Sequence, residues 1–184
     1  MLKHRIIPLL LLKNGRMVKT IQFDTYRDVG DPVTAARVYD SQRADELLFL
    51  DISASKEERR IFFDVIRAAA EECFMPLGVG GGIRSGEDIR LLLQQGADKV
   101  VINTAAFEED GFITYAAERF GSSTIVVSID AKKHADGVYE VCVRGATKTI
   151  GIDPVAWARQ VETWGAGEIM ITAIDREGTM QGLD

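Results

Sequence analysis

A glycine-rich segment carries the sharpest chemical signal in the chain. It reads Gly-Val-Gly-Gly-Gly-Ile-Arg-Ser over residues 78–85, between a β-type run and a helical run, and places Gly80, Gly81 and Gly82 in succession. Successive glycines let backbone amides approach a phosphate closely, and the start of the following helix adds partial positive charge. The segment therefore predicts a phosphate site, with a tight turn that binds no ligand as the alternative.

The segment matches neither of two nucleotide-binding motifs. A dinucleotide fingerprint that begins at Gly78 would need a glycine where the chain has Ile83, and no Gly-Lys-Ser/Thr sequence follows as in a P-loop. Ser85 and Asp88 have instead the spacing of a capping box at the start of a helix. We therefore expect no nucleotide cofactor, and we expect the chain to need neither another cofactor nor a metal ion.

Polar residues also end three of the predicted strands. Asn103 and Thr104 follow the fourth strand and would face the same anion as the glycines, although Asn103 could serve only as a helix cap. Asp130 ends the fifth strand and is a candidate general acid or base, or else a structural carboxylate bonded to loop amides. The end of the sixth strand adds three more polar groups, Thr172, Asp175 and Glu177.

Charged residues gather at the opposite ends of the strands. Where strands begin, the chain has two cations and two anions, which are Arg5, Glu46, Lys99 and Glu168. These side chains could pair as a closed ring in the mouth of a barrel, so that no net charge is left unsatisfied. Solvated strand ends are the alternative interpretation.

The elements that would position these residues alternate along the chain. Short runs of Val, Ile and Leu predict strands near residues 5–12, 46–52, 76–80, 98–102, 124–130 and 168–174. Amphipathic runs predict helices near residues 31–43, 56–73, 86–95, 108–120 and 153–164. Apolar alternation near residues 17–23 and 138–143 predicts hairpins or lids that extend two of the loops. This order favours an α/β fold of βα units around a parallel sheet.

A duplicated segment narrows the choice of fold. The stretch that begins at Asp31 recurs from Asp153, at a constant offset of 122 residues, which suggests two copies of one supersecondary unit. Duplicated βα halves favour a (β/α)8 TIM barrel over an open doubly wound sheet, and such a barrel typically takes about 250 residues. We therefore expect a single incomplete barrel domain over residues 1–184, with about six of eight βα units. Its first half would span about residues 1–122, and a truncated second half about residues 123–184.

The same repeat exposes a missing carboxylate. When the strands that open the two halves are aligned, Leu11 lies opposite Asp130. One of two expected carboxylates is therefore absent. Asp175 and Glu177, at the end of the sixth strand, could partly replace it.

The composition limits the classes of partner. The chain has 184 residues, a formal net charge of −6 and a sequence pI near 5.0, which argue against nucleic acid as a partner. Cys73 and Cys142 lie far apart and form no C-x-x-C pair, so neither a disulfide framework nor a zinc site is indicated. No apolar run approaches the roughly 20 residues of a membrane span, and we expect a cytoplasmic protein without a membrane partner.

Together these residues resemble the cyclase subunit of imidazole glycerol phosphate synthase, the TIM-barrel half of a glutamine amidotransferase of histidine biosynthesis. The resemblance covers essentially the whole chain, from RIIP through GDP, LDI-x-AS, VGGGIRS, GADKV-x-IN-x-AA, IDAK and GAGEI to IDREGT. In that family a separate glutaminase subunit releases ammonia, which enters at the bottom of the barrel and travels through it to a phosphorylated small-molecule substrate. The resemblance therefore implies a glutaminase partner.

The resemblance also implies roles for individual residues. Residues that match the gate at the ammonia entrance are Arg5, Glu46, Lys99 and Glu168, and Asp98 matches a contact with the glutaminase. Residues that match phosphate-binding elements are Gly80, Gly81, Gly82, Asn103, Thr104 and Gly178. Catalytic positions match Asp130, Lys19 and Thr172, and Glu177 takes the place of an aspartate.

Leu11 is the main departure from that family, because it stands where the catalytic partner of Asp130 is expected. An aliphatic side chain can neither donate nor accept a proton. The segment LLLLK, followed by GRMVKTIQF, looks more like a divergent paralogue of lipopolysaccharide and other surface-polysaccharide pathways. Such a paralogue would deliver ammonia to a sugar amidotransferase that converts an acetamido group into an acetamidino group.

We therefore expect an ammonia-delivering subunit of this surface-sugar type. The first alternative is a genuine histidine-pathway cyclase, which makes imidazole glycerol phosphate and the aminoimidazole carboxamide ribotide. The second alternative is a scaffold that docks the glutaminase and binds phosphate without catalysis.

Overall fold

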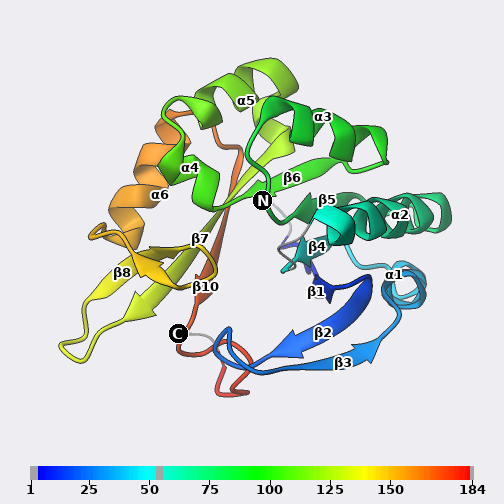
Figure 1. The fold of residues 1–184 in the computed structure, drawn as a ribbon, viewed down its shortest axis with the longest axis horizontal. Helices are drawn as coiled ribbons and strands as arrows, with labels where there is room; N and C mark the ends of the chain where they lie inside the picture. Colours follow the sequence, from blue (N-terminus) through cyan, green and yellow to red (C-terminus); the bar gives the residue numbers. More distant parts are fainter. Residues whose placement is uncertain (1–3, 53–55, 183–184) are drawn as a thin grey trace. The chain divides into compact units, whose positions relative to one another are not determined.

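The computed structural model describes residues 4–52 and 56–182 and contains two compact units (Figure 1). Unit 1 comprises residues 1–19 and 28–101, and unit 2 comprises residues 20–27 and 102–184. Both units combine strands with helices, and each contains parallel strand pairs beside antiparallel hairpins. The predicted α/β class with parallel strands is therefore confirmed, while the barrel and its two halves stay predictions.

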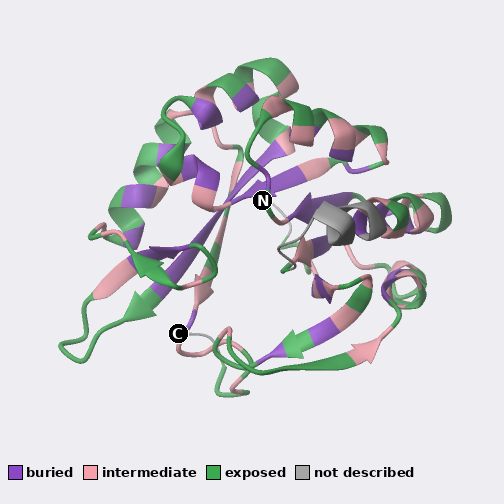
Figure 2. Ribbon diagram, in the orientation of Figure 1, coloured by how far each residue is buried: buried purple, intermediate pink, exposed green. Residues whose placement is uncertain are grey.

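Unit 1 is built around the strands β1 (Leu9–Lys13), β2 (Arg16–Thr20), β3 (Tyr26–Gly30), β4 (Leu47–Asp51), β5 (Leu77–Gly80) and β6 (Lys99–Ile102). They follow one another in the order β3-β2-β1-β4-β5-β6, with β1, β4, β5 and β6 parallel and β2 antiparallel to β1. Its helices are α1 (Pro32–Ser41), α2 (Lys56–Glu72) and α3 (Gly86–Gln94). Fully buried side chains of β4, α2 and α3, namely Phe49, Ile66 and Ile89, form part of the core (Figure 2).

Unit 2 contains the strands β7 (Ile125–Lys133), β8 (Tyr139–Val143), β9 (Lys148–Thr149) and β10 (Glu168–Ala173), in the order β10-β7-β8-β9. Its helices are α4 (Thr104–Glu108), α5 (Phe112–Phe120), the 3₁₀ turn η1 (Ser122–Thr124) and α6 (Pro154–Thr163). Helices α5 and α6 pack against β7, whose first seven residues are all buried. The centre of this unit is therefore the strand that carries Asp130.

The two units repeat one pattern of pairing. Strand β1 pairs antiparallel with β2 and parallel with β4, as β7 pairs antiparallel with β8 and parallel with β10. Leu11 lies in register with Leu50, and Asp130 lies in register with Thr172. Helices α1 and α6 both have 10 residues, with proline in the first turn and an aspartate cap, Asp31 or Asp153. Pairing and register thus agree with the predicted duplication.

Two predicted elements have different boundaries. Strand β1 begins at Leu9 rather than near residue 5, because Pro8 has no N–H to donate, although its carbonyl accepts a bond from Leu48 N at 2.9 Å. The helix predicted near residues 108–120 is present as α5 but begins only at Phe112, and the short helix α4 before it was not predicted. The two helices are separated at Gly111, where a φ of 74° cannot continue a right-handed helix.

Both predicted hairpins are present, as β1–β2 and β7–β8. Asn14 and Gly15, which join β1 to β2, both have positive φ, as a two-residue hairpin turn of type I′ requires. Among the described residues, no helix combines the length and apolar character that crossing a membrane requires.

Candidate active site

Asp130 is the most buried charged group in unit 2, with 7% of its surface exposed. It lies on β7 in register with Thr172 on β10 and with Cys142 on β8. The side-chain amide of Asn103, just after β6, donates from Nδ2 to Asp130 Oδ2 at 3.0 Å and to the Ser128 carbonyl at 3.1 Å. The carboxylate is thus held by a neighbouring side chain, and among the described residues no backbone amide of a loop donates to it.

Burial raises the pKa of Asp130 to about 6, because the ionised form loses hydration. Hydrogen bonds from Asn103 and Ser128 favour the ionised form and offset this effect only in part. A carboxyl group that titrates near neutral pH can both take up and release a proton. The geometry therefore suits Asp130 to the predicted role of general acid or base.

The side chain of Asn103 is turned toward Asp130 and does not cap the helix that follows. Asn103 occupies the cap position of α4 but makes no side-chain capping bond, so the interpretation as a simple helix cap is wrong. Thr104 Oγ1 donates to Asn103 Oδ1 at 3.2 Å and accepts from the Arg144 backbone N–H at 2.9 Å. A connected chain of hydrogen bonds therefore runs from Arg144 through Thr104 and Asn103 to Asp130.

Sequence analysis missed Ser128 as part of this site. Ser128 is 7% exposed and lies two residues before Asp130 on β7, so both side chains point to the same face of the strand. Two polar residues at that spacing within a run of Val and Ile were the available signal. Ser128 therefore joins Asp130, Asn103 and Thr104 as a residue of the candidate site.

The glycine-rich segment lies in unit 1, and its glycines have a packing role. Gly81 has a φ of +116°, and a Cβ atom there would lie 2.3 Å from the Asp51 carbonyl oxygen. A Cβ atom at Gly80 would lie 2.6 Å from the Leu50 side chain and 2.8 Å from that of Val101. The close approach of neighbouring segments therefore accounts for Gly80 and Gly81, and phosphate binding by this segment stays a prediction.

The other predicted residues near this segment also have defined places. The capping box of Ser85 and Asp88 at the start of α3 is confirmed. Gly82 has a positive φ of 62° and is exposed. Lys19 is exposed on β2, and Leu11 is half-buried on β1. Because Asn103 and Thr104 belong to unit 2, one phosphate site shared with the glycines stays a prediction.

The polar residues after β10 are bound to other segments of unit 2. Asp175 Oδ2 accepts from the Lys133 backbone N–H at 2.7 Å, at the end of β7. The carboxylate of Glu177 accepts bonds from Thr20 and Phe23. Gly178 has a φ of +70°, and a Cβ atom there would lie 2.2 Å from the Thr20 carbonyl oxygen. The close approach of these two segments therefore requires glycine at this position.

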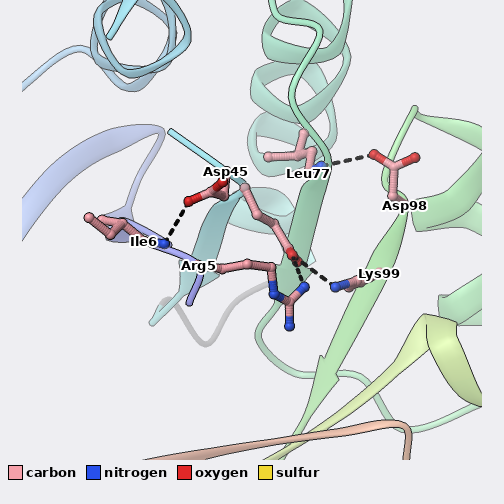
Figure 3. A network of polar contacts seen from close by, with 7 residues as sticks. Arg5, Ile6, Asp45, Leu77, Asp98 and Lys99 are labelled. Atoms are coloured by element: carbon pink, nitrogen blue, oxygen red, sulfur yellow. Dashed lines mark hydrogen bonds and ion pairs between the residues drawn. The ribbon is translucent and has the colours of Figure 1, made fainter. Parts of the chain in front are cut away.

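An ion-pair cluster in unit 1 lies where β1, β4 and β6 begin. Glu46 is 2% exposed, and its Oε2 accepts from Arg5 Nη1 at 3.0 Å and from Lys99 Nζ at 2.8 Å (Figure 3). Its other oxygen, Oε1, is buried without a hydrogen-bond partner among the described residues. The structure thus brings together three of the four charges predicted to pair. Glu168, half-buried at the start of β10, belongs to unit 2, and its place in the ring stays a prediction.

Asp98 fixes the start of β5 to the strand beside it. Its Oδ2 accepts from Leu77 N at 2.8 Å, and its own N–H donates to the Leu77 carbonyl at 2.8 Å (Figure 3). Ile6 N–H similarly donates to Asp45 Oδ2 at 2.9 Å. Carboxylates therefore hold the strand starts that surround the cluster, and a contact of Asp98 with a partner stays a prediction.

The chain is an α/β protein with two distinct polar regions. Polar side chains lie at the carboxyl ends of strands in unit 2, and an ion-pair cluster lies at the starts of strands in unit 1. A family model described as "Histidine biosynthesis protein" matches residues 5–184. Over all 184 residues the chain is 50% identical to the imidazole glycerol phosphate synthase subunit HisF of Alkaliphilus metalliredigens (strain QYMF), and it covers 73% of that protein. The chain belongs to the histidine biosynthesis protein family.

Proposed function

We propose that this chain works as an ammonia-accepting subunit of the HisF type, partnered by a separate glutaminase. The observation that carries the proposal is the buried carboxylate of Glu46, which binds Arg5 and Lys99 through one oxygen, while its other oxygen has no donor among the residues that the structure describes. A buried acceptor of this kind favours a small guest that carries N–H groups, such as ammonia or ammonium. The 50% identity to a HisF subunit supports the same assignment.

In this proposal ammonia reacts with a phosphorylated small molecule at the carboxyl ends of the strands. Asp130 transfers protons there, because its pKa of about 6 lets it act as either acid or base near neutral pH. In this proposal the glycine segment is a phosphate-binding element of unit 1, and Asn103, Thr104 and Gly178 are phosphate-binding residues of unit 2. Lys19 and Thr172 are further groups of the site.

Two observations favour different products of this chemistry. The pairing of Asp130 with Asn103, together with the identity to HisF, favours cyclisation to imidazole glycerol phosphate. Leu11 favours the surface-sugar role, because the residue that matches Asp130 in the first half cannot transfer a proton. In that second candidate function the chain delivers ammonia to a sugar amidotransferase.

A partner assay tests the shared part of the proposal. The chain is mixed with a glutaminase of the same family, and glutamine hydrolysis is measured with and without the phosphorylated substrate. Glu46→Ala and the milder Glu46→Gln are expected to reduce stimulation of the glutaminase about tenfold, since a buried ion pair is broken. Glu87→Ala, at an exposed carboxylate on α3, is the matched control. Unchanged stimulation in both Glu46 variants would contradict the proposal.

A second assay separates the two candidate products. The chain is supplied with ammonium salts and the phosphorylated cyclisation substrate, without a glutaminase. Formation of imidazole glycerol phosphate supports the cyclase. Absence of that product, with glutamine-dependent formation of an acetamidino sugar when a sugar amidotransferase is added, supports the surface-sugar role.

A further inference from the structure

Glu177 holds the segment between β2 and β3 with both oxygens of its carboxylate. Its Oε1 accepts from Thr20 Oγ1 at 2.8 Å, and its Oε2 accepts from the Phe23 backbone N–H at 3.1 Å. Thr20 is 7% exposed, so the first of these bonds lies largely out of water. Although Glu177 and Thr20 are 157 residues apart in sequence, both belong to unit 2. The carboxylate is therefore a two-point contact between distant segments.

Backbone contacts fasten the same two segments. Gln22 N–H donates to the Glu177 carbonyl at 3.0 Å, and Gln22 Nε2 donates to the Asp175 carbonyl at 2.9 Å. Gln22 and Phe23 have φ angles of 52° and 62°, a conformation that residues other than glycine rarely adopt. Such a conformation persists only where the surrounding contacts impose it. The contacts with residues 175–178 supply that constraint.

The turn after β10 is also bonded to β7, the strand that carries Asp130. Asp175 accepts a bond from the backbone of Lys133, the last residue of β7 and three positions beyond Asp130. Thr172, on β10 before this turn, lies in register with Asp130. A continuous path of hydrogen bonds and backbone thus runs from Phe23 through Glu177 and Asp175 to the candidate active site.

We propose that Glu177 is a positioning residue that seats residues 20–27 on the turn after β10 and does not itself transfer protons in the reaction. Each oxygen of its carboxylate accepts a bond from the segment that it holds, so this segment sets the orientation of the carboxylate. A side chain one methylene shorter would withdraw the carboxylate and lose at least one of the two bonds. The contacts alone carry this assignment, and only its effect on turnover rests on the proposed function.

Amide hydrogen exchange of residues 20–27 in the full chain tests the contact directly. Glu177→Ala removes both acceptors, and the Phe23 amide is expected to exchange roughly tenfold faster. Thr20→Val removes only the hydroxyl donor, and Glu177→Gln keeps one acceptor oxygen, so both are expected to have smaller effects. Glu118→Ala, at an exposed carboxylate on α5, is the control. Exchange that matches the control in Glu177→Ala and Thr20→Val alike would overturn the proposal.

Kinetics with ammonium salts separates positioning from proton transfer. Thr20→Val and Glu177→Gln are expected to raise KM for the phosphorylated substrate by similar factors, with kcat changed less than threefold. If Glu177→Gln loses as much kcat as Glu177→Ala while Thr20→Val behaves like the parent, Glu177 transfers protons and the proposal fails. If the parent shows no turnover, the proposed cyclase chemistry fails, and the exchange experiment still decides the positioning role.

Discussion

Strands β1 and β7 occupy equivalent places in the two units, yet one carries a leucine where the other carries a carboxylate. Each pairs with an antiparallel strand on one side and a parallel strand on the other. In β1 the register joins Leu11 to Leu50, whereas in β7 it joins Asp130 to Thr172. Strand pairing and register are therefore the same whether this position holds Leu11 or Asp130. The difference between the two residues bears on chemistry and not on the pairing of the strands.

The comparison also shows what a polar residue at this position requires. Asp130 is supported by Ser128 on its own strand and by Asn103 from the segment after β6. Leu11 has Leu9 two residues before it on the same face, and Leu50 beside it. A proton-transfer site therefore needs a polar surrounding, which unit 2 has and which β1 and β4 of unit 1 lack at the matching register.

The largest expected effect comes from removal of the carboxylate that only β7 carries. If the chain turns over the cyclisation substrate, Asp130→Asn lowers kcat roughly a hundredfold or more, because an amide cannot exchange a proton with the reacting centre. Steady-state turnover with ammonium salts measures this loss. Asp136→Asn, in the exposed β7–β8 turn, is the control. A loss of less than threefold would remove Asp130 from proton transfer and make the two strands functionally alike.

A substitution at Asp130 should change how the unfolding free energy depends on pH, whereas a substitution at Leu11 should not. The pKa of Asp130 is raised from 3.8 to about 6 in the folded chain. Protonated Asp130 therefore contributes to stability fully below pH 3.8, and this contribution is lost as the pH rises through about 6. The loss corresponds to about 3 kcal/mol. Asp130→Asn should therefore gain about 2 kcal/mol of unfolding free energy relative to the parent between pH 4 and pH 7, because part of the loss has already occurred at pH 4.

Urea unfolding at several pH values measures this difference. Leu11→Asn is the control from the other strand, because neither residue titrates and its difference from the parent should not change with pH. A difference between Asp130→Asn and the parent that is independent of pH would contradict the raised pKa.

A carboxylate placed in β1 should have an intermediate effect. Leu11→Asp is expected to raise ammonia-dependent turnover about tenfold. This gain is smaller than that of a fully supported general acid or base, because the apolar Leu50 lies beside the new carboxylate and offers it no hydrogen bond. Leu11→Asn has a similar shape without proton transfer and is the matched control. Equal turnover in the two variants would show that the missing carboxylate does not limit the reaction.

The smallest expected effect concerns the helices α1 and α6, which open the two copies of the repeat. Asp31 accepts a bond from Thr34 N at 2.7 Å, and Asp153 accepts one from Ala156 N at 2.9 Å. Asp31→Ala and Asp153→Ala should each lower the unfolding free energy by about 1 kcal/mol. Chemical denaturation measures both, with the asparagine variants as capping-competent controls. A clear inequality between the two losses would show that the repeated caps are not energetically equivalent.

Local patterns made most of the fold predictable from sequence. Apolar runs located the strands, and the repeat from Asp31 to Asp153 predicted two equivalent helices, to which the structure adds equivalent aspartate caps. The break at Gly111 was not anticipated, although the run Glu-Glu-Asp-Gly over residues 108–111 interrupts the apolar pattern and was an available signal.

Contacts between distant residues were harder to predict. Asn103 bonds to Asp130 across 27 residues, and Glu177 bonds to Thr20 across 157, and neither spacing has a local signature. Predicting such contacts requires the register between strands, which follows from the assembled sheet rather than from neighbouring residues. The residue types of the site were therefore visible in the sequence, whereas their partners were not.

The hydrogen-bond chain from Arg144 through Thr104 and Asn103 to Asp130 would make the binding of an anion at Thr104 and of a proton at Asp130 interdependent, if the proposed phosphate site lies at Thr104. The Thr104 hydroxyl has a single proton, and Asn103 already accepts it, so an anion that recruits this donor must rearrange the amide that stabilises ionised Asp130. An anion at one end of the chain and a proton at the other are then linked ligands. Linkage requires each to change the affinity of the other by the same factor, so occupancy at Thr104 would set how readily Asp130 holds its proton.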